Sequence, residues 1–166
     1  GSNSWTIPSF YPNDESGFAA NVFQNGNEVV LAIRGTEANL IEALPFVGET
    51  GWQDLLDADI ADIGFTGFAL DQTVSLVNYV MRLRGATGSA VTQVELHSIS
   101  VLAGTDPGII QPFIKIPGSA GAFTLDAYYW LEETVSATGL GILSDSYDVT
   151  VTGHSLGGHL AVMAIR

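Results

Sequence analysis

The chain has no cysteine, few basic residues and no long apolar run, and each absence excludes a class of protein. Without cysteine, neither a disulfide framework nor a thiolate metal site can form. Only five Lys and Arg residues oppose 18 Asp and Glu, a formal net charge of −13, so no basic stripe exists to bind nucleic acid or anionic lipid. No apolar run approaches the roughly 18 residues of a membrane-spanning helix.

What is present describes a globular protein. The length of 166 residues and the hydrophobic fraction of 46% fit one domain with a substantial core, and no repeat or linker divides it. We therefore expect one domain over residues 1–166. Acidity combined with the lack of cysteine is compatible with a secreted bacterial protein, so the expected location is extracellular.

The first half of the chain predicts a hairpin followed by a helix. Residues 17–23 and 28–34 favour two strands, because Asn25-Gly26 between them tolerates the positive φ of a tight turn. The segment Trp5–Pro12 is aromatic and interrupted by proline, so no regular element is expected there. Residues 70–84 have helical periodicity, and Gly85 can cap that helix. The predicted apolar stripe consists of Leu70, Val74, Val77 and Met81.

The middle of the chain leaves alternatives open. Residues 90–102 alternate as a strand, and His97 within it is expected to be a satisfied or surface histidine. Residues 104–121 are rich in Gly and Pro and predict either a flap over an apolar site or a packed surface hairpin. Residues 124–138 have helical spacing. Four aspartates within residues 51–65 fit a solvated acidic face better than a cation site, so no metal or cofactor is expected.

The most informative stretch is Asp148–Ala161. A β-branched run over residues 149–152 predicts a strand, and an apolar helical pattern begins at Leu156. Between them, Gly153-His154-Ser155-Leu156-Gly157 matches G-x-S-x-G, the sharp strand-to-helix turn that presents a nucleophilic serine. The alternative is a glycine-rich turn with an incidental serine. The strand before the motif and the helix after it favour the nucleophile.

Three blocks, in this order, resemble the class 3 lipase family of the α/β-hydrolase superfamily. They are Val29–Thr36, an apolar strand ending in Arg-Gly-Thr; Trp52–Leu55; and Val149–Ala161, with Gly-His-Ser-Leu-Gly-Gly. The resemblance implies the N-terminal part of an α/β-hydrolase fold, in which helices flank a mostly parallel sheet that begins with the N-terminal hairpin. It also implies that Ser155 is the nucleophile, and that Leu156 and Thr36 donate hydrogen bonds to the oxyanion.

The acid and the base of the family's Ser–His–Asp/Glu catalytic triad have no counterparts at the expected places in this chain. They follow the nucleophile in this superfamily, but only eleven residues follow Ser155, with no Asp or Glu among them. His159 lies one turn along the same helix, which points it away from the serine, and His97 and His154 precede the nucleophile. We therefore expect an incomplete hydrolase domain whose C-terminal remainder carries the Asp and His.

Two classes of function follow from these observations. The first is an ester hydrolase that cleaves lipid or other apolar esters through an acyl-enzyme on Ser155, with phospholipase A1 and other carboxylesterases as close alternatives. The second is a non-catalytic fragment or binding module, since the serine has no base within this chain.

Overall fold

The computed structural model describes residues 4–34, 59–117, 125–154 and 156–164. The chain divides into two compact units, which are described separately below. The first unit comprises residues 1–37, 72–93 and 134–166, and the second comprises residues 38–71 and 94–133. Within the described residues, no helix is both long enough and apolar enough to cross a membrane.

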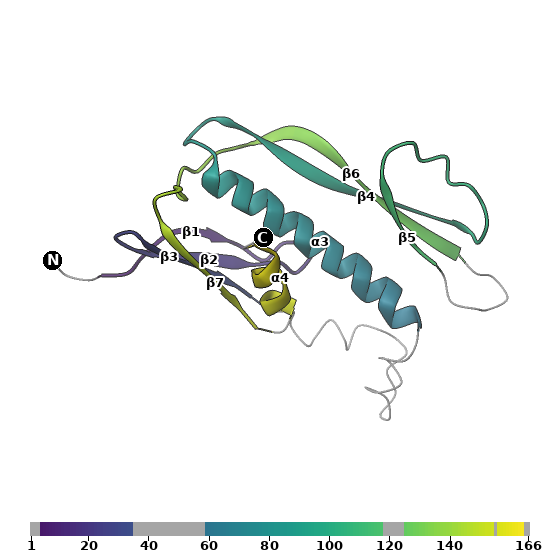
Figure 1. Ribbon diagram of the computed structural model, residues 1–166, viewed down its shortest axis with the longest axis horizontal. Coiled ribbons are helices and arrows are strands. Elements are labelled where there is room, and N and C mark those ends of the chain that lie inside the picture. The colour runs from purple at the N-terminus through teal and green to yellow at the C-terminus, as the bar shows by residue number, and fades with distance from the viewer. Residues whose placement is uncertain (1–3, 35–58, 118–124, 155, 165–166) are drawn as a thin grey trace, which may run out of the picture. The chain divides into compact units, whose positions relative to one another are not determined.

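The first unit is built on a four-stranded sheet with the order β1-β2-β3-β7. Its strands are β1 (Thr6–Tyr11), β2 (Ala20–Asn25), β3 (Glu28–Ile33) and β7 (Asp148–Gly153). Strands β1, β2 and β3 are joined antiparallel, whereas β3 and β7 run parallel (Figure 1). The sequence places a long stretch of chain between β3 and β7, which is what a parallel pair requires.

The α/β class and the N-terminal hairpin are confirmed. β2 and β3 pair over their full lengths from Ala20 with Ile33 to Asn25 with Glu28, and Gly26 adopts a φ of 61° in the turn. The expectation of a mostly parallel sheet is not met by the described strands, because β3–β7 is the one parallel pair in this mixed sheet.

β1 corrects the prediction that residues 5–12 form no element. Pro8 cannot donate a backbone hydrogen bond, which is why the segment reads as irregular. The strand lies at the edge of the sheet, where a missing donor is tolerated, and its register with β2 shifts between Thr6 and Ser9, on either side of Pro8.

The core of the first unit lies on one face of this sheet. Alternating residues of β2 and β3 are buried there, against α3 (Asp59–Arg84) and α4 (Leu156–Ala164). The buried members are Phe18, Ala20, Val22, Val29, Leu31, Ile33, Leu76, Tyr79, Leu83, Leu160 and Ala161.

The predicted C-terminal end of the α3 helix is confirmed at Arg84, but the predicted apolar stripe is wrong. The buried apolar residues of its described side chains are Leu76, Tyr79 and Leu83, whereas Met81 is exposed. The helix is therefore rotated from the expected orientation, and the phenol of Tyr79 donates a hydrogen bond to Ser9 Oγ at 2.8 Å. A buried tyrosine can replace an aliphatic residue in such a stripe when its hydroxyl finds a partner.

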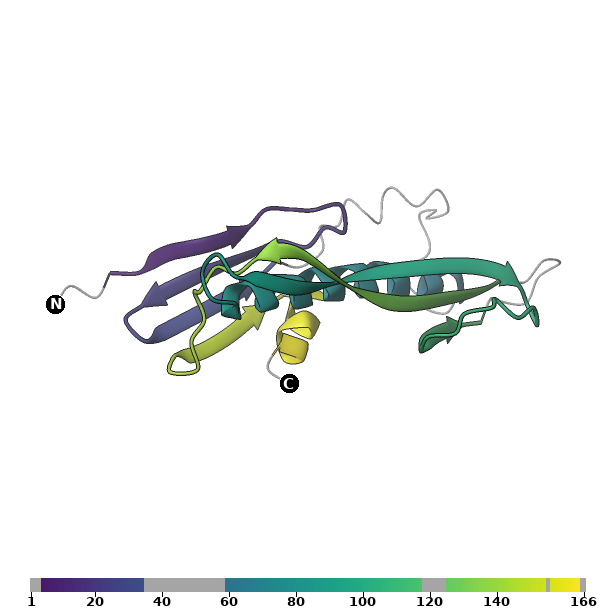
Figure 2. The same cartoon turned by 90° about the horizontal axis from the view of Figure 1, so that it is seen from above.

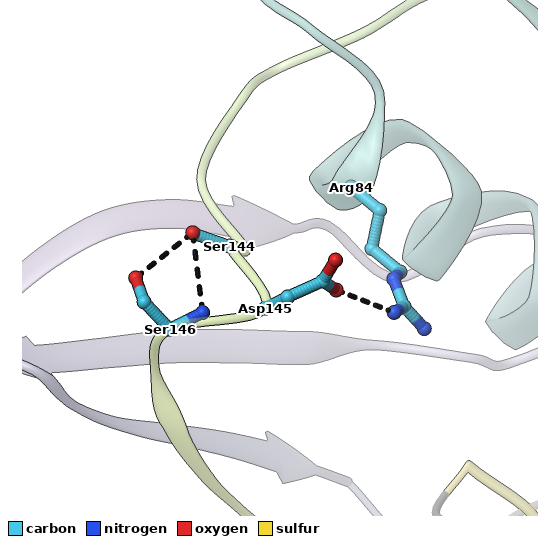
Figure 3. A network of polar contacts seen from close by, with 4 residues as sticks. All are labelled: Arg84, Ser144, Asp145 and Ser146. Atoms are coloured by element: carbon cyan, nitrogen blue, oxygen red, sulfur yellow. Dashed lines mark hydrogen bonds and ion pairs between the residues drawn. The ribbon is translucent and has the colours of Figure 1, made fainter.

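Within the first unit, the turn that follows α3 touches the backbone segment that follows β6. Gly139 lies so close to this turn that an added Cβ would stand 2.3 Å from the carbonyl oxygen of Ala86. The following segment is bonded to the helix end, since Leu140 N donates to Arg82 O at 2.7 Å. On the loop that leads into β7, the carboxylate of Asp145 pairs with Arg84 (Figure 3).

A second sheet has the order β4-β6-β5 and consists of β4 (Ala90–Leu102), β6 (Leu125–Thr138) and β5 (Phe113–Ile116). β4 and β6 run side by side as a long twisted ribbon (Figure 2). We call β4, β5, β6 and the residues between β4 and β5 the arm. The predicted strand at residues 90–102 is confirmed. Between residues 104 and 121, β5 (Phe113–Ile116) pairs with β6, and this pairing does not decide between the flap and the packed hairpin.

β6 corrects the prediction of a helix at residues 124–138. Helical spacing of Leu125, Tyr128 and Leu131 suggested the helix. The same stretch is rich in aromatic and β-branched residues, which lose side-chain freedom in a helix and pack well on a sheet. Pairing with β5, from Phe113 opposite Trp130 to Ile116 opposite Ala127, decides in favour of the strand.

One face of the β5–β6 ribbon holds a connected group of polar and aromatic side chains. Lys115 Nζ lies 2.7 Å from the buried carboxylate of Asp126 and 5.6 Å from the centre of the Tyr128 ring. His97 of β4 stacks on Trp130, with ring centres 5.4 Å apart. His97 was predicted to be a satisfied or surface histidine; its side chain is partly buried, and its Nε2 lies 3.5 Å from Glu132 Oε2 with no hydrogen-bond partner among the described residues.

Candidate active site

The predicted strand–turn–helix around the serine motif is present. β7 ends at Gly153 and α4 begins at Leu156, so the strand ends and the helix begins within the motif (Figure 1). β3 ends beside it, because the parallel register aligns Ile33 with Gly153. The residues that follow both strands therefore leave the sheet at the same edge, which is where α/β proteins gather their sites.

Two glycines of the motif are required by close backbone contacts. An added Cβ on Gly153 would stand 2.2 Å from the carbonyl oxygen of Gly157. An added Cβ on Gly157 would stand 2.8 Å from Ile33 O and 2.9 Å from Arg34 O. Real Cβ atoms do not approach backbone this closely, so both positions must be glycine in this arrangement. The first turn of α4 thus packs directly on the end of β3.

The N-terminus of α4 supplies hydrogen-bond donors at this edge. The first four N–H groups of a helix, beginning here with that of Leu156, have no acceptor within the helix. No acidic side chain occupies the first turn to compete for them. The side chain of Leu156 is buried, whereas that of His154 is exposed. An anionic oxygen at this point would face partial positive charge.

Two of the three predicted site residues lie outside the described residues. They are Ser155 and Thr36, and with them the acidic cluster that includes Asp54 and Asp57. Leu156 is described and is the first residue of α4. Among the described residues, no group of three or more His, Asp or Glu side chains could hold a metal ion.

The first unit also contains a depression that the sequence did not predict. It has a volume of about 380 Å³ and lies between β1, the residues that follow it and the C-terminal half of α3. Tyr11, Tyr79 and Arg82 line it, and none of the motif residues does. The depression therefore gives no support to the predicted chemistry. No sequence signal marks it, because its lining comes from segments far apart in the chain.

The arrangement defines an α/β protein with a tight strand-to-helix turn beside the end of a parallel neighbour. The chain belongs to the class 3 lipase family, whose sequence model matches residues 75–165. Comparisons with curated proteins and with solved structures found no match. Membership of this family indicates a lipid ester hydrolase.

The match covers the serine motif and also the whole of the arm. It begins after the two N-terminal blocks, Val29–Thr36 and Trp52–Leu55, on which the resemblance partly rested. The role of Thr36 therefore depends on the position of β3 beside β7 and on the sequence that follows it.

Proposed function

We propose that this chain carries the nucleophile and the oxyanion site of a serine ester hydrolase that cleaves lipid esters. Ser155 is the nucleophile in this proposal, and the N–H groups of Leu156 and Thr36 bind the oxyanion. In this proposal the chain forms the N-terminal part of an α/β-hydrolase domain. The enzyme acts outside the cell.

The observation that carries the proposal is the contact of Gly157 with the end of β3. That contact brings the first turn of α4 next to Arg34, and Thr36 follows Arg34 by two residues in the sequence. An oxyanion hole needs two donors that converge from different segments, one after the nucleophile and one after a neighbouring strand. The position of Ser155 between Gly153 and Gly157 fits the nucleophile of such a turn.

The chemistry would run in two steps. Ser155 Oγ attacks the ester carbonyl while its proton passes to a histidine, and the oxyanion accepts hydrogen bonds from Leu156 and Thr36. Collapse of this intermediate returns the proton to the leaving alcohol and leaves an acyl-serine. Water, deprotonated by the same histidine, then attacks the acyl carbon, and the carboxylic acid and free serine are released.

The histidine and the acid that orients it are proposed to come from the C-terminal remainder of the domain. β7 lies at the edge of the sheet formed by the described strands, where a further parallel strand could pair. His97 is engaged with Trp130 and Glu132 in the second unit, which supports a base other than this residue.

A covalent probe tests the nucleophile. The full-length protein is treated with a long-chain alkylphosphonate, and the labelled peptide is identified by mass spectrometry. We expect a single adduct on Ser155, no adduct in Ser155→Ala, and full labelling in Ser146→Ala, whose serine lies on an exposed loop. Labelling of Ser155→Ala at the wild-type level would refute the assignment.

A chain-length series defines the substrate class. Hydrolysis of esters with short and long acyl chains, and of the sn-1 ester of a phospholipid, separates a lipase from a short-chain carboxylesterase and from phospholipase A1. We expect long-chain neutral esters to give the largest kcat/KM. A folded full-length protein that hydrolyses none of them and takes no label would favour the binding module.

A further inference from the structure

The segment that joins β4 to β5 exposes an unusual amount of apolar surface. We call residues 102–114 the tip loop. Ile110 is 98% exposed, and Leu102, Phe113 and Ile114 are 56%, 45% and 53% exposed. Single exposed apolar residues are common on proteins and need no explanation. Four large ones within thirteen consecutive residues, one of them almost wholly in solvent, point to a surface that is covered in function.

The tip loop is held in place by polar contacts at both ends. Near its start, Gly104 N approaches Asp126 Oδ2 at 3.4 Å, and the N–H of Thr105 donates to Leu102 O at 2.9 Å. Near its end, Gln111 Nε2 donates to Glu132 Oε1 at 3.2 Å. Both ends of the loop are thus hydrogen-bonded to β6 or within the loop itself, and the exposed Ile110 lies between these contacts.

The charge of the tip loop limits what can cover it. Asp106 is its one ionisable residue, and that carboxylate accepts the N–H of Gly108 at 2.8 Å. Lys115, the only lysine of the chain, follows the loop directly but is paired with Asp126. With no cation within the loop and a net charge of −13 on the chain, an anionic surface would repel this region. An uncharged apolar surface would not.

We infer that the tip loop adsorbs the protein onto neutral lipid by inserting Ile110 and its exposed apolar neighbours into the lipid–water interface. The inference rests on the proposed function, because a lipid ester hydrolase must reach substrate that is aggregated in water. It assigns adsorption to the arm and leaves ester cleavage to the serine motif. Burial of aliphatic side chains supplies the free energy, so adsorption needs no anionic headgroup.

The test measures adsorption without catalysis. Full-length protein carrying Ser155→Ala is mixed with phosphatidylcholine vesicles and separated by flotation, so that no lipid is consumed. We expect Ile110→Asp to lower the partition coefficient by about tenfold or more, since an aliphatic side chain is lost and a charge is added. Ile7→Asp is the matched control, because Ile7 is an exposed isoleucine on β1. It should change adsorption less than twofold, and replacing phosphatidylcholine by an anionic lipid should weaken binding by the unmodified loop.

Four outcomes would overturn the inference. They are equal adsorption by Ile110→Asp and the parent, an equal loss in Ile7→Asp, binding that requires anionic lipid, and a self-association without lipid that Ile110→Asp abolishes. The last would assign the loop to an interface between copies. Failure of the proposed function is detected separately, since it would remove phosphonate labelling of Ser155 without changing flotation. With Ser155 present, Ile110→Asp should hydrolyse a soluble short-chain ester at the parent rate.

Discussion

The two sheets of this chain are stabilised in opposite ways. The β1-β2-β3-β7 sheet buries an apolar face, and at the serine motif its end packs backbone against backbone at Gly153 and Gly157. The β4-β6-β5 sheet leaves large apolar side chains in solvent and connects polar ones, such as Lys115 and Asp126, to one another. At the motif of the first sheet, the backbone segments pack so closely that there is no room for one added methyl group. The second sheet exposes apolar side chains such as Phe113 and Ile114 to solvent.

The sharpest test of this contrast adds one methyl group at the motif. Gly157→Ala places a Cβ 2.8 Å from Ile33 O, so α4 must move away from β3. We expect a loss of about 3 kcal/mol or more in unfolding free energy, together with loss of ester hydrolysis, because the contacting atoms are backbone and cannot turn aside. Urea unfolding at equal protein concentration measures the first effect.

The control is Gly88→Ala, in the turn that leads to the arm. Gly88 has a φ of 76° and nothing within 4 Å of an added Cβ, so the substitution adds backbone strain without a collision. We expect a cost of about 1 kcal/mol and unchanged activity. Equal stability of Gly157→Ala and the parent would show that α4 does not rest on β3, and the proposed oxyanion site would lose its main support.

The next test breaks the polar connection of the arm. The hydrogen bond from Lys115 to the Asp126 carboxylate raises the pKa of the lysine. Asp126→Asn removes that negative charge. Since the carboxylate is almost fully buried, we expect amide protection in β5 to fall by about tenfold, while β2 and β3 keep theirs. Hydrogen exchange read by mass spectrometry measures both. Glu133→Gln, an exposed carboxylate on the same strand, is the control, and equal effects of the two would contradict a structural role for the pair.

Sequence reasoning succeeded where short-range chemistry decides the conformation. Asn25-Gly26 specifies a hairpin turn, and β-branched residues before Gly153 specify a strand that ends there. Both depend on residues within a few positions of one another. The tight turn and the start of α4 at Leu156 were predicted for the same reason. The roles of Ser155 and Thr36 stay predictions.

Sequence reasoning failed where distant partners decide. Residues 125–138 have apolar spacing that suits a helix, and pairing with β4 on one side and β5 on the other makes them a strand. Pro8 argues against a strand unless the strand lies at an edge, which no local pattern reveals. The buried stripe of α3 includes Tyr79, whose hydroxyl needs Ser9, seventy residues earlier in the chain. The pair of Lys115 with Asp126 could have been suspected, because the chain has a single lysine.

A pH titration should affect the first sheet through its tyrosines. Burial raises the pKa of Tyr79, and burial and the charge of Asp14 raise the pKa of Tyr11. A raised pKa means that the folded state favours the neutral phenol, so this stability is fully present below the unfolded value of about 10 and is lost as pH rises above it.

Tyr79→Phe should reduce the loss of unfolding free energy at alkaline pH. At neutral pH the variant should lose about 1 kcal/mol, because Ser9 loses its partner. Between about pH 9 and pH 11 its unfolding free energy should fall less than that of the parent, as measured by urea unfolding at each pH. Tyr147→Phe, on the loop before β7, serves as the control. An identical pH dependence in Tyr79→Phe and the parent would show that other groups cause the alkaline loss.

The smallest effect is expected at the ion pair between Arg84 and Asp145 (Figure 3). It has good geometry at 3.0 Å, but the side chains are 64% and 94% exposed. Water and salt screen such a pair, and ordering two long side chains offsets most of the attraction. We expect Asp145→Asn to change the unfolding free energy by less than about 0.5 kcal/mol. The same substitution at Asp126 removes a carboxylate at a similar distance from its cation, so the two variants differ mainly in burial. A larger loss of unfolding free energy for Asp145→Asn than for Asp126→Asn would contradict this expectation. It would mean that the ion pair holds the loop before β7 in place, and that the position of the serine motif depends on a surface charge.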